Sequence, residues 1–244
     1  QGLMNLLCPQ TGRILALLDG STLTALRTAA VSAVATEALA REGARTLSIL
    51  GAGVQAFEHI RALMKVRKFE RVKIFARDRL KLDKFKQDKL TAAISPAIEI
   101  QYCATVDDAI ADADVIVTCT SSAEPIIDSL KFPPGVHVNA VGSCRPGQQE
   151  VRLRIHPALK IFLDHRLSCL KEADEIFHPY SGENISSSVV GELGEVLNNK
   201  KQGRQSKDDV TFFKSVGIAA EDLFAAQLFY QSAIQKGRGT LVQF

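Results

Sequence analysis

Apolar and polar positions follow two patterns along the central part of the chain. Short apolar runs bounded by turns predict strands at 46–50, 71–76, 98–103, 114–119, 136–141 and 159–164. Helical spacing of apolar residues between these runs predicts helices at 54–66, 79–92 and 106–112. Strands rich in Val, Ile and Leu that alternate with amphipathic helices favour a parallel sheet covered on both faces. We therefore expect an α/β fold with a Rossmann-type doubly wound parallel sheet, which typically uses six such strands.

The two ends of the chain follow a different pattern. Residues 3–18 predict a hairpin with its turn at 9–12, and a helix rich in small residues follows as far as Ala40. Beyond residue 165 the sequence is more polar. It predicts three further elements, which are a helix near 190–199, a strand at 210–216 and a helix at 218–234.

A glycine-rich turn joins the first central strand to the helix after it. Residues 51–56 read GAGVQA, which fits the dinucleotide-binding pattern G-x-G-x-x-A. Gly51 permits the tight turn, and Gly53 lets a pyrophosphate approach the backbone. The free N–H groups near Val54 and Gln55 are expected to face this anion. The alternative is a tight corner without a ligand, but the context of strand, turn and helix favours a dinucleotide site.

The end of the second central strand bears on the choice of coenzyme. NAD enzymes place an acidic residue about 20 residues beyond the glycines, where it binds the ribose 2′-hydroxyl. Here the strand ends in Ala76 and Arg77, and a guanidinium suits the 2′-phosphate of NADP(H). Asp78 is the counter-argument, because a shift of one residue would place a carboxylate at the ribose. The pattern favours NADP(H), with NAD(H) as the alternative and a plain surface arginine as another interpretation of Arg77.

Composition excludes several classes of function. The net charge is +3, with 30 basic and 27 acidic residues interspersed, which gives no electrostatic case for nucleic-acid binding. The densest basic run, 81–89, is interpreted as the solvated face of a helix. No apolar run reaches the length of about 18 residues that a membrane span needs. The five cysteines are odd in number and widely spaced, and the histidines lack metal-ligand spacing, so we expect a reducing compartment and no metal.

Five motifs together resemble the ornithine cyclodeaminase/mu-crystallin family. They are RTAA at 27–30, GAGVQA at 51–56, NAVGSCRPG at 139–147, ELGEV at 192–196 and FKSVG at 213–217. The resemblance is strongest to the mu-crystallin branch. It implies a Rossmann domain, here 44–208, and a discontinuous substrate-binding and dimerisation domain, here 1–43 and 209–244. It also implies a family N-terminal segment without a counterpart in this sequence, so the second domain is expected to be a remnant.

The resemblance also implies roles for two charged residues and a threonine. Arg27 resembles the family arginine that binds the substrate carboxylate, which a planar guanidinium can grip at two points. Thr28 beside it is expected to donate to a cofactor phosphate. Asp164 ends a predicted strand, where ligands of open α/β sheets bind, and resembles the catalytic aspartate that orients and helps to protonate the substrate nitrogen. The alternatives are an ordinary helix arginine and an N-cap for a helix at 165–171.

Other candidates follow the ends of predicted strands. The hydroxyls of Thr118 and Thr120 are placed to contact ribose or nicotinamide, and Val141 ends a strand beside the expected nicotinamide face. Glu192 resembles a residue near the substrate, and Ser215 one near the nicotinamide amide, although ordinary surface positions are the alternative for both. We thus expect Arg27 and Asp164 to be catalytic, and Arg27 and Glu192 to bind substrate. The expected cofactor contacts are Thr28, Gly51, Gly53, Val54, Gln55, Ala76, Arg77, Asp78, Thr118, Thr120, Val141 and Ser215.

From the family we expect NADP(H)-dependent reduction of imines, namely cyclic ketimine carboxylates. An ornithine cyclodeaminase or an alanine or other amino-acid dehydrogenase is the alternative within the family. A non-catalytic protein that binds NADPH and a thyroid hormone is an alternative of a different class. The expected partners are a small imine or amino-acid substrate and a second copy in a homodimer, and the cytoplasm is the expected location.

Overall fold

The computed structural model describes residues 2–87, 95–179 and 182–242, and these form two compact units. The larger unit is Thr28–Gly217, and the smaller one joins the residues up to Arg27 to those from Ile218 onward. These limits differ from the expected boundaries at 43/44 and 208/209. The larger unit takes in the second half of helix α1 (Gly20–Leu39) and strand β12 (Val210–Lys214), because β12 lies inside the main sheet.

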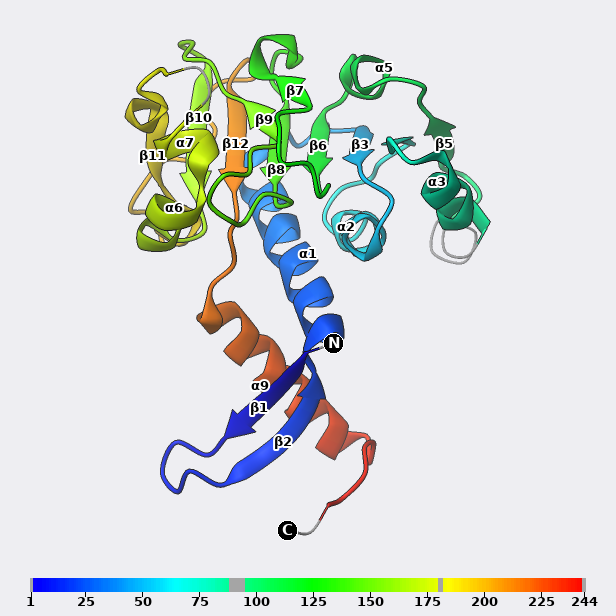
Figure 1. Ribbon diagram of the computed structural model, residues 1–244, viewed down its shortest axis with the longest axis vertical. Helices are drawn as coiled ribbons and strands as arrows, with labels where there is room; N and C mark the ends of the chain where they lie inside the picture. Colours follow the sequence, from blue (N-terminus) through cyan, green and yellow to red (C-terminus); the bar gives the residue numbers. More distant parts are fainter. Residues whose placement is uncertain (1, 88–94, 180–181, 243–244) are drawn as a thin grey trace. The chain divides into compact units, whose positions relative to one another are not determined.

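The larger unit is built on an eight-stranded sheet in which every neighbouring pair is parallel. Its strands follow one another from left to right in Figure 1 in the order β11-β10-β12-β8-β6-β3-β4-β5. Besides β12, they are β3 (Thr46–Leu50), β4 (Arg71–Phe75), β5 (Glu99–Tyr102), β6 (Val115–Thr118), β8 (His137–Ala140), β10 (Leu159–Leu163) and β11 (Val189–Glu192). The α/β class with a parallel doubly wound sheet is therefore confirmed.

The order of strands fixes where a ligand can bind. The chain runs outward from β3 through β4 to β5, then returns past β3 to β6 and β8. The order therefore reverses between β3 and β6, and open α/β sheets bind ligands in the crevice outside the carboxyl ends of the strands at such a point.

The core lies on both faces of this sheet. Ile116 of β6 belongs to one buried cluster, whereas its neighbours Val115 and Val117 belong to another. Successive side chains of a strand point to opposite faces, so both faces of β6 are covered. This explains why the strands read as continuous apolar runs rather than alternating ones.

The helices of the larger unit are short and mostly follow the strands. They are α2 (Val54–Leu63), α3 (Arg79–Phe85), α5 (Val106–Ile110), α6 (Arg166–Glu172), α7 (Asp174–Phe177) and α8 (Leu193–Leu197). Two of the helices expected here, at 54–66 and 106–112, end earlier than their apolar spacing indicated. The helix expected at 79–92 begins at Arg79 as α3, and its residues 88–92 lie outside the described part of the chain. Two 3₁₀ turns, η2 (Ser129–Lys131) and η3 (Ile185–Ser188), were not foreseen, nor was the parallel pair of β7 (Ile127–Asp128) and β9 (Val151–Arg152).

The helix expected near 190–199 was wrong in its first residues. Residues 189–192 form β11, which pairs with β10, and helix α8 starts only at Leu193. The reason is a capping box, in which the backbone N–H of Glu192 donates to Glu195 Oε2 at 2.9 Å. A capping box marks a helix start and leaves the preceding residues free to pair as a strand.

A buried polar chain ties the small-residue helix α1 to the sheet and to α2. Thr36 Oγ1 donates to Ser32 O at 2.7 Å and accepts from Asn139 Nδ2 at 2.9 Å. His59 Nε2 lies 2.9 Å from Ser32 Oγ, and its Nδ1 lies 2.8 Å from Gln55 O. The small residues of α1 thus permit close approach, and its hydroxyls satisfy polar groups on neighbouring elements.

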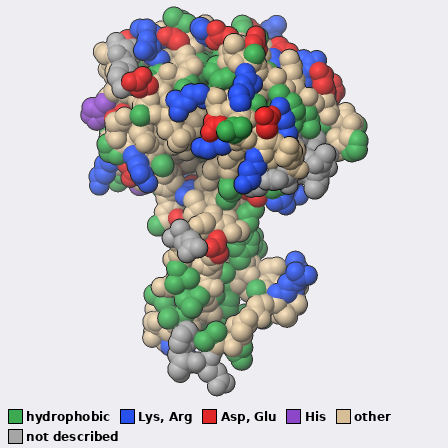
Figure 2. All heavy atoms as spheres, turned by 45° about the vertical axis from the view of Figure 1, so that its right-hand side comes forward, with side chains coloured by type: hydrophobic (Ala, Val, Ile, Leu, Met, Phe, Trp, Pro, Cys, Tyr) green, Lys and Arg blue, Asp and Glu red, His purple; other side chains and the backbone are tan. Residues whose placement is uncertain are grey.

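The smaller unit contains the expected hairpin, formed by antiparallel β1 (Leu3–Leu7) and β2 (Ile14–Asp19), together with the start of α1 and helix α9 (Ala219–Gln235). Leu6, Leu23 and Ala226 form its small buried cluster. Many of its apolar side chains remain exposed, among them Leu3, Phe224 and Leu228, and Figure 2 shows hydrophobic side chains gathered over this unit.

Candidate functional site

The glycine turn has the geometry that a bound pyrophosphate requires. Gly51 has φ +136°, and a Cβ there would lie 2.7 Å from Cys119 O, so only glycine fits. Gly53 precedes α2, and a Cβ there would meet nothing within 4 Å, so its backbone faces open space. No side chain caps the first N–H groups of α2, which include those of Val54 and Gln55. The turn therefore leaves donors at a helix N-terminus exposed to an anion, and it fits a dinucleotide.

A cavity of about 340 Å³ opens beside this turn, at the carboxyl ends of β3, β4 and β6. This is the point where the strand order reverses. The expected residues Gly51, Gly53, Ala76, Arg77, Asp78 and Thr120 line it. The other lining residues are Ala52, Phe75, Lys81, Cys119, Ser121, Ser122 and Ile126.

Lys81 is the functional candidate in this cavity that was missed from the sequence. It begins the basic run at 81–89, which was interpreted as a solvated helix face, yet it lines the cavity beside Arg77 and Asp78. Its position one turn into α3 is the signal that could have found it, because residues three to four apart share one helix face.

The carboxylate of Asp78, which lines the cavity, already has hydrogen-bond partners in helix α3. Asp78 is the N-cap of α3, and its Oδ1 accepts from the backbone N–H of Lys81 at 3.1 Å. Its Oδ2 lies 3.9 Å from Lys81 Nζ. The exposed guanidinium of Arg77 makes no hydrogen bond or ion pair with any described residue. Arg77 is thus available to a ligand, whereas Lys81 and Asp78 are already paired with each other.

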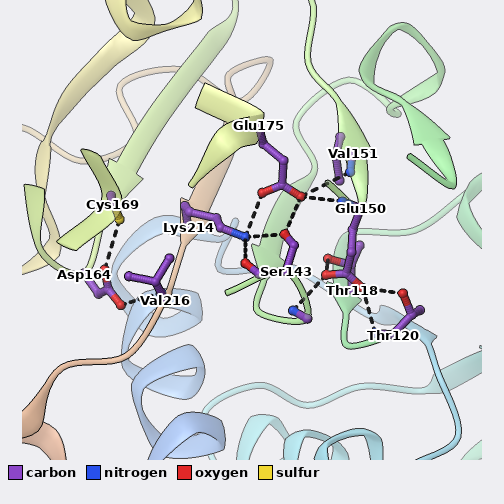
Figure 3. A network of polar contacts seen from close by, with 11 residues as sticks. Thr118, Thr120, Ser143, Glu150, Val151, Asp164, Cys169, Glu175, Lys214 and Val216 are labelled. Carbon is purple, nitrogen blue, oxygen red and sulfur yellow. Dashed lines mark hydrogen bonds and ion pairs between the residues drawn. The ribbon is translucent and has the colours of Figure 1, made fainter. Parts of the chain in front are cut away.

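On the other side of the crevice, the buried carboxylate of Glu150 accepts hydrogen bonds from residues at the ends of β6 and β8. Glu150 Oε2 accepts from Thr118 Oγ1 and from the backbone N–H of Gly142, both at 2.8 Å. Its Oε1 accepts from the N–H and the hydroxyl of Thr120, at 2.6 and 2.7 Å (Figure 3). Thr118 is fully buried, so its hydroxyl faces Glu150 rather than the cavity. Val141 donates its N–H to Thr118 O at 3.0 Å, which holds the two strand ends together.

A second carboxylate and a lysine continue this network. Lys214 Nζ lies 2.7 Å from Glu175 Oε2, and both side chains are fully buried. Lys214 also donates to the carbonyl and hydroxyl oxygens of Ser143, at 2.5 and 2.7 Å. Burial first and the charge of Glu175 second raise the pKa of Glu150. None of Glu150, Glu175 and Lys214 was assigned a role from the sequence, because 25 and 64 positions separate Glu150 from Glu175 and from Lys214.

Asp164 lies just beyond β10 with its carboxylate fully hydrogen-bonded. Oδ2 accepts from the backbone N–H groups of Val216 and Gly217, both at 2.7 Å. Oδ1 accepts from the N–H of His165 at 2.6 Å and from Cys169 Sγ at 3.2 Å. Burial, reinforced by Asp164, raises the pKa of the Cys169 thiol, so it stays protonated and donates. The N-cap of α6 is His165 rather than Asp164, whose carboxylate instead fixes the segment that follows β12.

Glu192 and Ser215 lie at the same edge of the sheet. Glu192 pairs with Leu163 in the register of β10 and β11, and its Oε1 accepts from the N–H of Arg166 at 2.7 Å. It therefore satisfies the first backbone N–H of α6, beside the N-cap His165. Ser215 is buried at the end of β12, and its N–H donates to Ala140 O at 3.2 Å.

Arg27 belongs to the smaller unit, where it is paired. Its guanidinium lies 2.9 Å from Glu221 Oε2 and 3.0 Å from Asp222 Oδ1, and its side chain is 13% exposed. Thr28, the next residue, is buried and begins the larger unit. The structure thus brings the strand-end candidates to one edge of the sheet and places Arg27 in the other unit.

In the described ranges, no His, Cys, Asp and Glu side chains form a group that could hold a metal ion. No helix in those ranges is long and apolar enough to cross a membrane.

Comparison with known proteins agrees with the fold. The model of the ornithine cyclodeaminase/mu-crystallin family matches residues 1–237. A Delta(1)-pyrroline-2-carboxylate reductase of Bacillus cereus (strain ATCC 10987 / NRS 248) is 40% identical over 237 residues, which cover 96% of this chain and 72% of that protein. The ketimine reductase mu-crystallin of Mus musculus is 39% identical over 224 residues, which cover 92% of this chain and 67% of that protein.

A solved structure gives the same picture. The Delta(1)-pyrroline-2-carboxylate reductase of Thermococcus litoralis, in complex with NADH and L-proline, superimposes with a TM-score of 0.89 at 32% identity. The match covers 98% of this chain and 73% of that one. The resemblance expected from the five motifs is therefore confirmed, and the chain belongs to the ornithine cyclodeaminase/mu-crystallin family.

Proposed function

We propose that this chain reduces imines with a nicotinamide coenzyme, and that its substrates are cyclic ketimine carboxylates. The observation that carries the proposal is the cavity at the glycine turn, at the point where the strand order reverses. Its family relatives named above, two pyrroline-2-carboxylate reductases and a ketimine reductase, support the reaction class. Bound in this crevice, a reduced nicotinamide supplies a hydride to the carbon of a C=N bond.

The chain's own residues bind and orient the two partners. The backbone at Gly51 and Gly53 and the first amides of α2 hold the pyrophosphate, and Thr28 donates to a phosphate. Arg27 binds the substrate carboxylate, for which it must exchange partners with Glu221 and Asp222. The protein's contribution is thus alignment and electrostatics around a reaction that the coenzyme carries.

Asp164 orients the substrate nitrogen and helps to protonate it, because its carboxylate stabilises the protonated iminium form. It accepts from four donors, and a carboxylate offers about four lone-pair sites. A contact with substrate therefore requires it to release one donor. The thiol of Cys169 is the weakest of the four, so we assign the exchange to that bond. Glu192, on the adjacent strand end, lies at the substrate, and Ser215 lies at the nicotinamide amide.

NADP(H) is the coenzyme that the charges favour. Arg77 and Lys81 line the cavity, and Asp78 is occupied as the cap of α3 and by Lys81, so the guanidinium of Arg77 rather than a carboxylate is free to meet the ribose. Arg77→Ala and Lys81→Ala should each weaken NADPH binding while leaving NADH binding unchanged. Arg79→Ala is the matched control, because Arg79 donates to Ala104 O and does not line the cavity. Equal losses for both coenzymes would refute the assignment.

We also propose a homodimer in the cytoplasm. The exposed apolar side chains of the smaller unit support self-association, since exposed patches of this kind mark interaction sites. All five cysteines are described and none forms a disulfide, which suits a reducing compartment. Light scattering on the purified chain tests the dimer, and a monomer at all concentrations would contradict it.

The activity is tested with Delta(1)-pyrroline-2-carboxylate and NADPH, by following the loss of reduced coenzyme. Wild type should turn over, and Asp164→Asn should lose activity. Coenzyme binding without turnover in the wild type would contradict imine reduction and favour a non-catalytic NADPH-binding protein.

A further inference from the structure

The buried carboxylate of Glu150 connects two turns that the proposed mechanism needs in place. It accepts from the backbone N–H of Thr120 after β6 and from that of Gly142 after β8. These strands are neighbours, and Thr118 pairs with Ala140 at their carboxyl ends. A Cβ at Gly142 would collide with the Glu150 carboxylate and lie 2.5 Å from Thr120 O. The glycine thus permits the close approach that the carboxylate needs.

Glu150 is itself held by a second buried acid. Its backbone N–H donates to Glu175 Oε1 at 2.7 Å, and that of Val151 donates to the same atom at 3.3 Å. Ser143 Oγ also donates to Glu175 Oε1, at 2.8 Å. Lys214 from β12 pairs with Glu175 (Figure 3), and its charge also favours the ionised form of Glu150. The network therefore links the carboxyl ends of β6, β8 and β12 through side chains without contact with solvent.

Such a buried cluster is poorly explained by stability alone. The desolvation of buried charges offsets most of their attraction, and apolar replacements of similar volume are often neutral or stabilising. Two carboxylates share one lysine here, which makes the cost larger. The charges instead provide a fixed geometry, because backbone N–H groups that meet a buried carboxylate have only one low-energy arrangement.

The position of the cluster indicates what that geometry serves. A doubly wound sheet binds a dinucleotide across its two halves, with the pyrophosphate at the first glycine turn. The half with β3 and β4 meets the adenosine side, where Arg77 and Lys81 lie. The half with β6 and β8 therefore meets the nicotinamide side, and Glu150 lies beneath the turns of that half.

We propose that Glu150 is a positioning residue for the nicotinamide half of the coenzyme, supported by the Glu175–Lys214 pair. It acts through the turns at Thr120 and Gly142 and touches no ligand itself. The inference rests on the proposed dinucleotide site and adds a residue whose effect is confined to one half of it.

Glu150→Gln tests this with two ligands. Glutamine keeps the size of the side chain but turns one carboxylate oxygen into an NH₂ group, which then faces the N–H of Thr120 or of Gly142. A lost hydrogen bond to a charged group corresponds to a weakening of about 10-fold to 100-fold. We expect that loss for NADPH, measured by coenzyme fluorescence, and less than about 2-fold change for adenosine 2′,5′-bisphosphate, measured by calorimetry. Lys81→Ala is the matched control, since it should weaken both ligands.

A milder pair of variants keeps the test decisive if Glu150→Gln does not fold. Thr118→Val removes one donor to Glu150 at a buried position, and Thr118→Ser restores the hydroxyl. The valine variant should weaken NADPH but not adenosine 2′,5′-bisphosphate, and the serine variant should bind like the wild type. Equal losses for both ligands, or no loss for either, would overturn the inference. Failure of the wild type to bind NADPH or NADH would instead overturn the proposed function.

Discussion

Two buried histidines should make the stability of the larger unit depend on pH well above the range where carboxylates titrate. His59 lies between α1 and α2, and burial lowers its pKa to about 4, although the bond to Gln55 opposes the shift. His137 lies in β8, and burial, followed by the charge of Arg204, lowers its pKa to about 3. Both imidazoles are therefore neutral in the folded protein at every pH from 7 to 5.

The direction of the effect follows from proton linkage. The ordinary histidine pKa of about 6.5 applies to the unfolded chain, which therefore binds more protons than the folded chain below that pH. The contribution of each neutral, buried histidine to the free energy of unfolding is fully present above pH 6.5. It is lost as the pH falls toward the pKa of that histidine in the folded protein. Below pH 6.5, each histidine lowers the free energy of unfolding by about 1.4 kcal/mol for every pH unit. Between pH 7 and pH 5 the loss is about 2 kcal/mol for each, and about 4 kcal/mol for both.

Urea unfolding followed by circular dichroism measures this loss, because the chain has no Trp to serve as a fluorescence probe. The free energy of unfolding should fall between pH 7 and pH 5 in the wild type. His59→Gln should reduce that fall by about 2 kcal/mol, whatever its effect on stability at pH 7. A free energy that is flat between pH 7 and pH 5, or equal slopes in the wild type and His59→Gln, would refute the reasoning.

The remaining predictions concern the glycine turn and the buried lysine. Gly51→Ala should destabilise the fold by at least about 1–3 kcal/mol, because of its positive φ and the clash with Cys119 O, and thermal unfolding measures this. Gly53→Ala should unfold like the wild type but bind reduced coenzyme more weakly, since its Cβ meets only open space; equal stability losses in the two variants would contradict the contrast. Lys214→Met should destabilise by about 3–5 kcal/mol in chemical unfolding, because it leaves Glu175 buried without its cation. A loss below about 1 kcal/mol would show that the pair is not needed for folding.

Local patterns explain what could be predicted from the sequence. The strand at 46–50 and the start of the next helix at Val54 are found where expected, because an apolar run, two glycines and a helical spacing all lie within about 15 residues. Local apolar runs also allowed Asp164 and Ser215 to be predicted at the ends of strands. Strand β11 was missed because it has only four residues and directly precedes a helix.

The rest of the site depends on contacts between distant residues. Asp78 looks like a possible ribose ligand in the sequence, and only the structure shows that its carboxylate caps α3. The partners of Glu150 come from β6, from the turn after β8 and from α7. No spacing rule links such positions, since the topology of the sheet brings them together. For the same reason Asp164 could be placed at a strand end, whereas its bonds to Val216 and Gly217 could not be foreseen.

The most direct test of the dinucleotide site is a fluorescence titration of NADPH and of NADH with the purified chain. We expect a saturable change in coenzyme emission, tighter for NADPH than for NADH and weakened in Gly53→Ala. If neither coenzyme shows a saturable change with folded wild-type protein, the glycine turn holds no dinucleotide and the account is contradicted.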